Sequence, residues 1–337
     1  MDGLPQQDAF LRKIGVASLD CSRDGTIIGK EVRMPDAQDD DMTGRPTGTT
    51  AGTIGSSPGS PKQRYFLSLL TPVRDEESYL IEFINYYLIQ GVDHFYFYDN
   101  DSKIPVADVI LEYRDKCSVM RAPGDAVQAR AYQHFCKHFK HETTWVAVFD
   151  IDEFVLPHKH SSFREFLLDY DYCDGIGINW VMFGDGHHKT RPDGGVIANY
   201  LYRQAGQHPC IKSVIKGMKL VGFFDNPHLA TLPEGSLYVD PHMNRIESAY
   251  NENFTTDVIQ LNHYFTKSEA EWKTKLSRKR ADSGKSRAEH TEDHDWVFTA
   301  NESYNEIRET LIVDRYGERL AEALRARGAM PGAITRV

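Results

Sequence analysis

The sequence predicts an α/β fold built on a mostly parallel sheet with helices on both faces. From residue 64 onward, short apolar runs alternate with amphipathic segments long enough to be crossover helices. Charged and polar residues directly follow three of the apolar runs. This arrangement is typical of open α/β sheets, which bind ligands where their parallel strands end.

Four apolar runs have the composition of buried strands. Each is rich in aromatic, branched or other large apolar residues and is bounded by charged or turn-forming residues. In chain order they are RYFLSLLTPV at 64–73, HFYFYD at 94–99, SVMRA at 118–122 and WVAVFD at 145–150.

Three segments between these runs are expected to be helices. The first begins an i, i+3, i+4, i+7, i+8 apolar stripe at Leu80 and ends at Gly91. The other two are IPVADVILEYRDK at 104–116 and residues 126–140. Residues 303–328 also show helical periodicity with alternating charges on the opposite face, which predicts a C-terminal helical appendage.

Composition narrows the class of protein. The chain has 337 residues, of which 40% are hydrophobic, and a net charge of −10, which argues against a general nucleic-acid binder. Its five cysteines are scattered and lack the paired spacing of a zinc site, so a reduced compartment is expected. No apolar run approaches roughly 18 residues and the N-terminus lacks a signal-peptide layout, so we expect a soluble, cytoplasmic protein.

The chain divides into four predicted regions. Residues 1–35 form an N-terminal extension whose sequence favours neither a hairpin nor an unstructured chain. Residues 36–63 are dominated by Gly, Ser, Thr, Pro and Asp and are expected to be a flexible linker. The main domain is expected over 64–282, followed by the C-terminal helical segment over 283–337.

Three carboxylates follow the WVAVFD run within four positions, Asp150, Asp152 and Glu153. Residues i and i+2 of an extended segment point to the same side, so two of these carboxylates could share a divalent cation. Oxygen ligands suit Mn²⁺ or Mg²⁺ and leave coordination positions for substrate phosphates. A solvated loop or a helix cap is the ordinary role of such a short motif, and the motif alone does not decide between them.

Other polar residues end the first two strands. Arg74, Asp75 and Glu76 follow the first, and Asp99 and Asn100 end the second. A carboxylate at Asp99 could accept hydrogen bonds from a ligand at this edge of the sheet, although Asp-Asn sequences also form turns.

Four sequence blocks follow one another along the chain. They are TPVRDEESYLIEFINYYLIQGVDHFYFYDNDS (71–102), the helix around Gln128–Tyr132, WVAVFDIDEFVLP (145–157) and NHYFTKSEAEWKTKLSRKRAD (262–282). Taken in this order, the blocks resemble glycosyltransferases of GT-A fold, in particular family 92 and the related family-2-like group. The resemblance covers about residues 65–282. Asp75 departs from it, because the family usually has Asn before the glutamate.

The resemblance implies that 64–282 is a GT-A domain that transfers a sugar from a nucleotide-sugar donor to a hydroxyl of a glycan or glycolipid acceptor. The donor it implies is UDP-linked, the transfer inverting and the cofactor Mn²⁺ or Mg²⁺. The metal ligands it implies are Asp150, Asp152 and His263, with His228 as a further candidate, while Glu153 orients the turn. Donor-binding residues are expected at Arg74, Glu76, Asp99, Asn100, Gln128, Asp150, Lys212, Lys267 and Arg278.

An inverting transfer needs a base for the acceptor hydroxyl, and a carboxylate is the usual choice. Asp185 follows Trp180, whose ring would suit a sugar, in a glycine-rich turn. Asp225 and Glu234 are alternatives, and an ordinary turn residue is the other interpretation of Asp185.

The basic block after the NHY sequence is expected to form a solvated helix face. Two cations near it, Lys267 and Arg278, are the exceptions, because their position suits a phosphate partner. The block comprises Lys273, Lys275, Arg278, Lys279 and Arg280.

Two rival functions remain at this point. An apolar strand ending in Asp-x-Asp also begins haloacid-dehalogenase-like phosphohydrolases. Three preceding strand-like runs and Phe154 in the motif oppose that interpretation. The second rival is a non-catalytic carbohydrate-binding protein that keeps the GT-A fold. Peripheral membrane contact would suit a lipid-linked acceptor, but the C-terminal helix is neither strongly basic nor aromatic.

Overall fold

The computed structural model describes residues 63–224, 226–278 and 302–327. The expected N-terminal extension, the linker apart from Gln63, and Asp225 lie outside these ranges. The C-terminal segment is described from residue 302 to residue 327.

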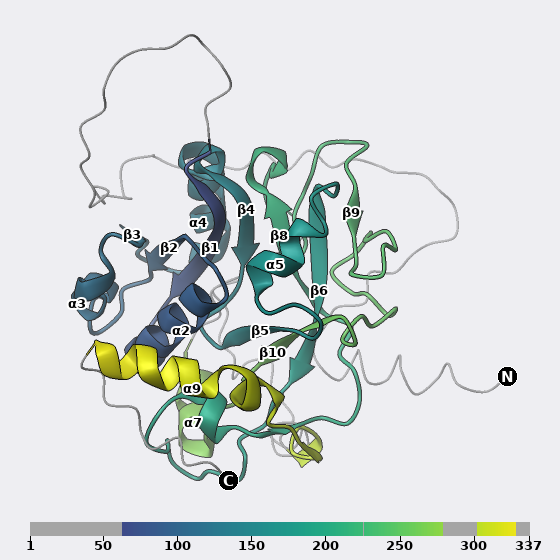
Figure 1. Ribbon diagram of the computed structural model, residues 1–337. Coiled ribbons are helices and arrows are strands. Elements are labelled where there is room, and N and C mark those ends of the chain that lie inside the picture. Colours follow the sequence, from purple (N-terminus) through teal and green to yellow (C-terminus); the bar gives the residue numbers. More distant parts are fainter. Residues whose placement is uncertain (1–62, 225, 279–301, 328–337) are drawn as a thin grey trace, which may run out of the picture.

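Nine strands of the described residues form one mixed sheet in the order β3-β2-β1-β4-β8-β6-β10-β5, with β9 beside β6 (Figure 1). Strands β1 to β4 pair in parallel, whereas β8 runs antiparallel to β4 and β6, and β5 antiparallel to β10. The predicted mixed, mostly parallel sheet flanked by helices is confirmed. The strands are β1 (Tyr65–Val73), β2 (His94–Asp99), β3 (Cys117–Arg121), β4 (Thr143–Val148), β5 (Glu153–Pro157), β6 (Gly175–Met182), β8 (Ile211–Lys216), β9 (Tyr238–Val239) and β10 (Ile259–His263).

Helices flank this sheet, and a short two-stranded ribbon joins β7 (Tyr202–Arg203) to β11 (Ile307–Arg308). Side chains of β1 alternate between two cores, because successive residues of a strand point to opposite faces. Leu67 and Leu69 join the core under α2, α5 and α9, while Leu70 joins the core under α4. The helices are α2 (Glu77–Ile89), α3 (Val106–Val109), α4 (Val127–His138), α5 (Phe163–Leu168), α6 (Val196–Asn199), α7 (Glu269–Leu276) and α9 (Leu311–Ala326).

Helix α2 confirms the apolar stripe predicted for its segment. Leu80, Phe83 and Ile84 are fully buried. The helix ends before Gly91, whose φ of +87° favours glycine. A Cβ at this position would lie 2.6 Å from the Cβ of Arg164, so a larger residue would displace that side chain.

The helix predicted over 104–116 is shorter in the structure. Helix α3 covers four residues and is followed by a 3₁₀ turn at Leu111–Tyr113. The α-helical backbone is interrupted at Ile110, with φ −100° and ψ 26°. Val106, Val109 and Ile110 are β-branched and lose side-chain freedom in a helix, which explains why the apolar spacing alone overestimates this element.

The C-terminal helical appendage is confirmed as α9, drawn in yellow beside α2 in Figure 1. Tyr316 packs edge-on against Tyr86 of α2 at 5.7 Å between ring centroids. Arg315 donates to the carbonyl oxygen of His160 at 2.6 Å. Among the helices of the described residues, none is both long and apolar enough to cross a membrane.

Candidate functional site

Asp150 and Asp152 lie in the turn that joins β4 to β5, and Glu153 is the first residue of β5; this segment is here called the acidic turn. The conformation of this turn depends on Glu153. The backbone N–H of Asp150 donates to Oε2 of Glu153 at 2.8 Å, and the N–H of Glu153 donates back to the Asp150 carbonyl at 3.1 Å. Glu153 is fully buried, and this burial raises the pKa of its carboxyl. Glu153 therefore orients the turn, as expected.

Strand register brings two further predicted residues to this turn. Strand β8 runs antiparallel to β4, so its first residues, including Lys212, lie at the carboxyl end of β4. Strand β10 pairs with β5 so that His263 lies opposite Glu153 and next to Asp152. The N–H of Tyr264 donates to the Asp152 carbonyl at 2.8 Å, which fixes the two segments together.

Asp152 is 7% exposed and lies between a lysine and a histidine. Its Oδ2 accepts from Nζ of Lys275 at 2.7 Å, and its Oδ1 lies 3.6 Å from Nε2 of His263. Burial alone would raise the pKa of Asp152, but the cationic neighbours, Lys275 first, hold it well below its usual range. Burial lowers the pKa of His263, so its imidazole is neutral at neutral pH and Lys275 carries the compensating charge.

Asp150 is paired with Lys212 across a 2.7 Å contact, and the same ammonium lies 3.5 Å from Glu153. The Lys212 side chain is 1% exposed, whereas that of Asp150 is 36% exposed. Burial would lower the pKa of Lys212, but the two carboxylates outweigh it and raise the pKa, so this buried lysine stays charged.

A second buried lysine, Lys267, binds Glu76 of the loop after β1 at 2.6 Å. Its ammonium also lies 4.2 Å from the centre of the Tyr79 ring. Lys267 and Asp75 both have positive φ, +52° and +53°, which costs free energy in non-glycine residues. Two of the seven described non-glycine residues with positive φ therefore lie in the loops that meet at the strand ends.

Arg74, Asn100 and Arg278 extend this contact. Nη1 of Arg74 donates to Oδ1 of Asn100 at 3.4 Å, and Nη1 of Arg278 donates to the Arg74 carbonyl at 3.3 Å. Nε of Arg278 lies 3.8 Å from Asp75. The loop after β1 is therefore tied both to the end of β2 and to the residues that follow α7.

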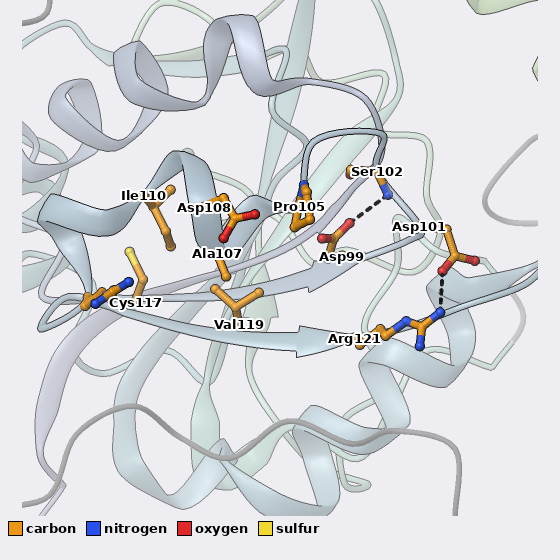
Figure 2. A pocket seen from close by; sticks show the side chains of 11 residues that line it. Asp99, Asp101, Ser102, Pro105, Ala107, Asp108, Ile110, Cys117, Val119 and Arg121 are labelled. Carbon is orange, nitrogen blue, oxygen red and sulfur yellow. Dashed lines mark hydrogen bonds and ion pairs between the residues drawn. The ribbon is translucent and has the colours of Figure 1, made fainter.

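Asp99 has the turn-forming contacts that the sequence offered as an alternative to nucleoside binding. Its two carboxylate oxygens accept from the N–H groups of Ser102 and Val106, each at 3.0 Å. Figure 2 shows Asp99 on the wall of a hollow of about 750 Å³ that also contains Asp101 and Arg121. This hollow lies beside β2, α3 and β3, and its lining does not include the acidic turn.

The remaining predicted residues are buried in hydrogen-bond networks. Gln128 donates to the Tyr132 hydroxyl at 2.7 Å. Tyr132 lies near enough to Lys212 and Asp150 for both charges to influence the pKa of its hydroxyl. Oδ1 of Asp185 accepts from the His187 N–H and from the Asn305 amide, both at 2.8 Å.

Aromatic rings surround the histidine side of the acidic turn. Trp180 lies 4.3 Å from His263, 4.9 Å from His228 and 5.5 Å from His208 between ring centroids. The Trp180 indole Nε1 is buried and makes no hydrogen bond with the described residues. This cluster supplies aromatic faces beside Asp152. Glu234, the other candidate base, is exposed.

The expectation that Lys275 belongs to a solvated face is wrong. Its side chain is 20% exposed and bound to Asp152. The sequence spacing indicates that Lys275 faces inward, because Trp272 lies three residues earlier on the same helical face and is only 5% exposed. The charge-run rule failed because it ignored this buried neighbour.

Asp152 and His263 fit a divalent cation as a two-residue ligand pair. The carboxylate is ionised and the imidazole is neutral, and the ring nitrogen that faces the carboxylate, Nε2 of His263, lies 3.6 Å from Oδ1 of Asp152. The described residues contain no group of three or more His, Cys, Asp or Glu able to hold a metal. A cation at this pair would therefore take further ligands from substrate phosphates or water, as Mg²⁺ commonly does.

Two plant proteins are similar in sequence to this chain. A protein of Arabidopsis thaliana described as a glycosyltransferase family 92 protein is 27% identical over 217 residues, covering 60% of this chain and 35% of the relative. One of Ricinus communis with the same description is 27% identical over 158 residues, covering 43% of this chain and 27% of the relative. The chain thus spans about a third or less of the length of these relatives.

Among solved structures, Staphylococcus aureus TarS residues 1–349 align with a TM-score of 0.29 and 12% identity, over 45% of this chain and 47% of that one. The same protein in complex with UDP aligns with a TM-score of 0.30 and 14% identity, over the same shares. Scores this low do not bear on function.

The profile of glycosyltransferase family 92 matches residues 70–299, a span that contains the acidic turn, Lys212, His263 and α7. It includes most of the sheet and every contact described above between the acidic turn and its lysines. The chain belongs to glycosyltransferase family 92.

Proposed function

We propose that this protein transfers a sugar from a nucleotide-sugar donor to a hydroxyl of a glycan or glycolipid acceptor, with Mn²⁺ or Mg²⁺ as cofactor. One observation carries the proposal: in a family 92 chain, Asp152 and His263 lie together at the end of β4, beside the buried Lys212 and Lys267 and the partly exposed Lys275. Asp152 and His263 would hold the cation, which when bound neutralises charge on the departing diphosphate.

The lysines give the site its capacity for phosphate. Lys212 and Lys267 are buried cations held within hydrogen-bond distance of Asp150 and Glu76. Fixed positive charge near a developing anion stabilises the transition state more in a partly buried site than in water. Arg74 and Arg278 extend the same positive edge toward the end of β2. A UDP-linked donor and an inverting outcome extend the proposal on the strength of the family resemblance.

Asp185 is the proposed base for the acceptor hydroxyl. Its loop is tied to α7, because the Glu269 N–H donates to the His188 carbonyl at 3.0 Å and Lys189 pairs with Glu269. Asp185→Asn keeps the size of the side chain and removes its basicity, so kcat should fall while donor affinity is unchanged. Unchanged kcat would assign Asp185 to turn formation alone.

Calorimetric titration of UDP and UDP-sugars, with Mn²⁺ and after EDTA, tests the donor site directly. Binding that requires Mn²⁺ supports the proposal, and sugar transfer to an acceptor is then measured with the donor that binds. Absence of nucleotide binding under both conditions would favour a non-catalytic carbohydrate-binding role. Phosphate release from a phosphomonoester would favour the phosphohydrolase, which the family membership opposes.

A further inference from the structure

We propose that Lys275 is an exchangeable counter-ion of Asp152, which a divalent cation must displace in order to bind. The inference rests on the proposed function, because it concerns how the same site is loaded with its cation. It assigns a regulatory role to a residue of α7, outside the acidic turn.

Lys275 occupies the carboxylate at close range. Its Nζ is 2.7 Å from Oδ2 of Asp152 and 3.0 Å from the carbonyl oxygen of Phe265, and it lies 4.6 Å from the centre of the Phe265 ring. The other oxygen, Oδ1, faces His263. An ammonium and a divalent cation on one carboxylate would repel each other strongly in this partly buried position.

The position of Lys275 on α7 allows it to leave without unfolding the helix. The start of α7 is anchored by a capping box between Ser268 and Glu271. Glu271 also accepts hydrogen bonds from the hydroxyls of Tyr79 and Tyr200. Lys275 belongs to the last turn, and its side chain reaches Asp152 through four methylene groups. Rotation of this stem can carry the ammonium away while the anchored end of the helix stays in place.

Lys212 does not share this freedom. Its side chain is 1% exposed and lies between Asp150 and Glu153, whereas that of Lys275 is 20% exposed. Moving the ammonium of Lys212 away from these two side chains would leave a buried charge without its partners, which is costly. Of these two lysines, Lys275 is the one built to exchange.

Mn²⁺ binding to the full chain without nucleotide, followed by electron paramagnetic resonance of the free ion, tests the exchange. The variants are Lys275→Met and Lys275→Gln, with Lys275→Arg to restore the charge. Lys273→Met is the matched control, because Lys273 is on the same helix, 64% exposed at its side chain and paired with Glu269. Circular dichroism and thermal melting establish that each variant is folded.

Both neutral variants should bind Mn²⁺ at least about tenfold more tightly than the wild type, the scale on which neighbouring residues tune metal sites. Lys275→Arg and Lys273→Met should stay close to the wild type. Adding Asp152→Asn to Lys275→Met should abolish the gain, because it removes the carboxylate for which the two cations compete.

Two outcomes overturn the inference and can be told apart. If the neutral variants bind Mn²⁺ no better than the wild type while Asp152→Asn weakens binding, the cation binds beside Lys275 and the proposed function stands. If Mn²⁺ binds to none of the proteins, even with UDP present, the metal-dependent function fails together with the exchange.

Discussion

Two buried aspartates of this protein are stabilised in different ways. Asp240 is fully buried and accepts hydrogen bonds from the backbone N–H groups of His242 and Asn244 at 2.9 Å. The side-chain amides of Asn244, Asn251 and Asn253 also donate to it, at 3.0–3.3 Å. Asp152 is almost as buried, but its close partner is the ammonium of Lys275.

The difference separates a structural carboxylate from one suited to exchange. Neutral donors fixed on the backbone or on short asparagine side chains stabilise an anion without any mobile charge. A lysine on a flexible stem stabilises the anion equally well, but another cation can take its place. The identity of the partner, more than burial, therefore indicates whether a buried acid serves the fold or the site.

Asp240→Ala tests the structural member and should have the largest effect on folding. The change leaves several buried donors without an acceptor, each of which typically costs about 1–3 kcal/mol, so the free energy of unfolding should fall by at least about 3 kcal/mol. Urea denaturation should show that decrease in the free energy of unfolding. Asp240→Asn keeps one acceptor oxygen and should be less destabilising. Wild-type stability of Asp240→Ala would show that Asp240 does not stabilise the fold.

Asp152→Asn tests the other member. Sugar transfer should fall by about 10²–10³-fold, the usual effect of removing one electrostatic stabiliser, which corresponds to about 3–4 kcal/mol in the activation barrier. The free energy of unfolding should fall by no more than about 1 kcal/mol, because Lys275 can turn toward solvent. Activity assays and urea denaturation measure the two effects. A stability loss equal to that of Asp240→Ala would show that both aspartates are structural.

Glu82 on α2 offers a test by pH. It is 6% exposed and accepts from the N–H groups of Val196 and Ile197, and burial raises its pKa from 4.5 to about 7 despite these bonds. Because the folded pKa exceeds the unfolded one, its stabilising contribution is complete below pH 4.5 and is lost as pH rises through 7. The lost contribution is about 3 kcal/mol, because the pKa of Glu82 rises from 4.5 to about 7 on folding.

Comparing the wild type with Glu82→Gln isolates this effect, since other titrating groups cancel in the difference. Between pH 4 and pH 8, the free energy of unfolding of the wild type should fall by about 3 kcal/mol relative to that of Glu82→Gln. A difference that stays constant with pH would mean that the pKa of Glu82 is the same in the folded and unfolded states, as it is for a fully exposed acid.

Much of the fold could be predicted from local pattern. Each of five elements is indicated by its own local sequence, and all five are confirmed. They are the strands β1, β2, β3 and β4, indicated by apolar runs, and the helix α2, indicated by its apolar stripe. The antiparallel placement of β8 could not be predicted in that way, because it depends on which strands become neighbours after the chain has folded.

The site was predictable to a similar depth. Asp150, Lys212 and His263 carry motif or family signals, and the structure brings them together around the acidic turn. The pairing of Asp152 with Lys275 spans 123 residues and required the end of α7 to reach β4. A charge run cannot reveal which of its members faces inward, unless a buried neighbour such as Trp272 marks the face.

Arg121→Ala should produce the smallest effect and defines the boundary of the site. Arg121 pairs with Asp101 at 3.3 Å, with side chains 68% and 43% exposed, so removing it should change the free energy of unfolding by less than about 0.5 kcal/mol. UDP affinity measured by calorimetry should change by less than about twofold, because the hollow that Arg121 lines does not include the acidic turn. Lys212→Met, measured alongside, should weaken UDP binding. A large loss of UDP affinity in Arg121→Ala, with none in Lys212→Met, would place the nucleotide in the hollow of Figure 2, where Asp99 would bind it. The donor would then bind away from the carboxylate–lysine pairs of the acidic turn.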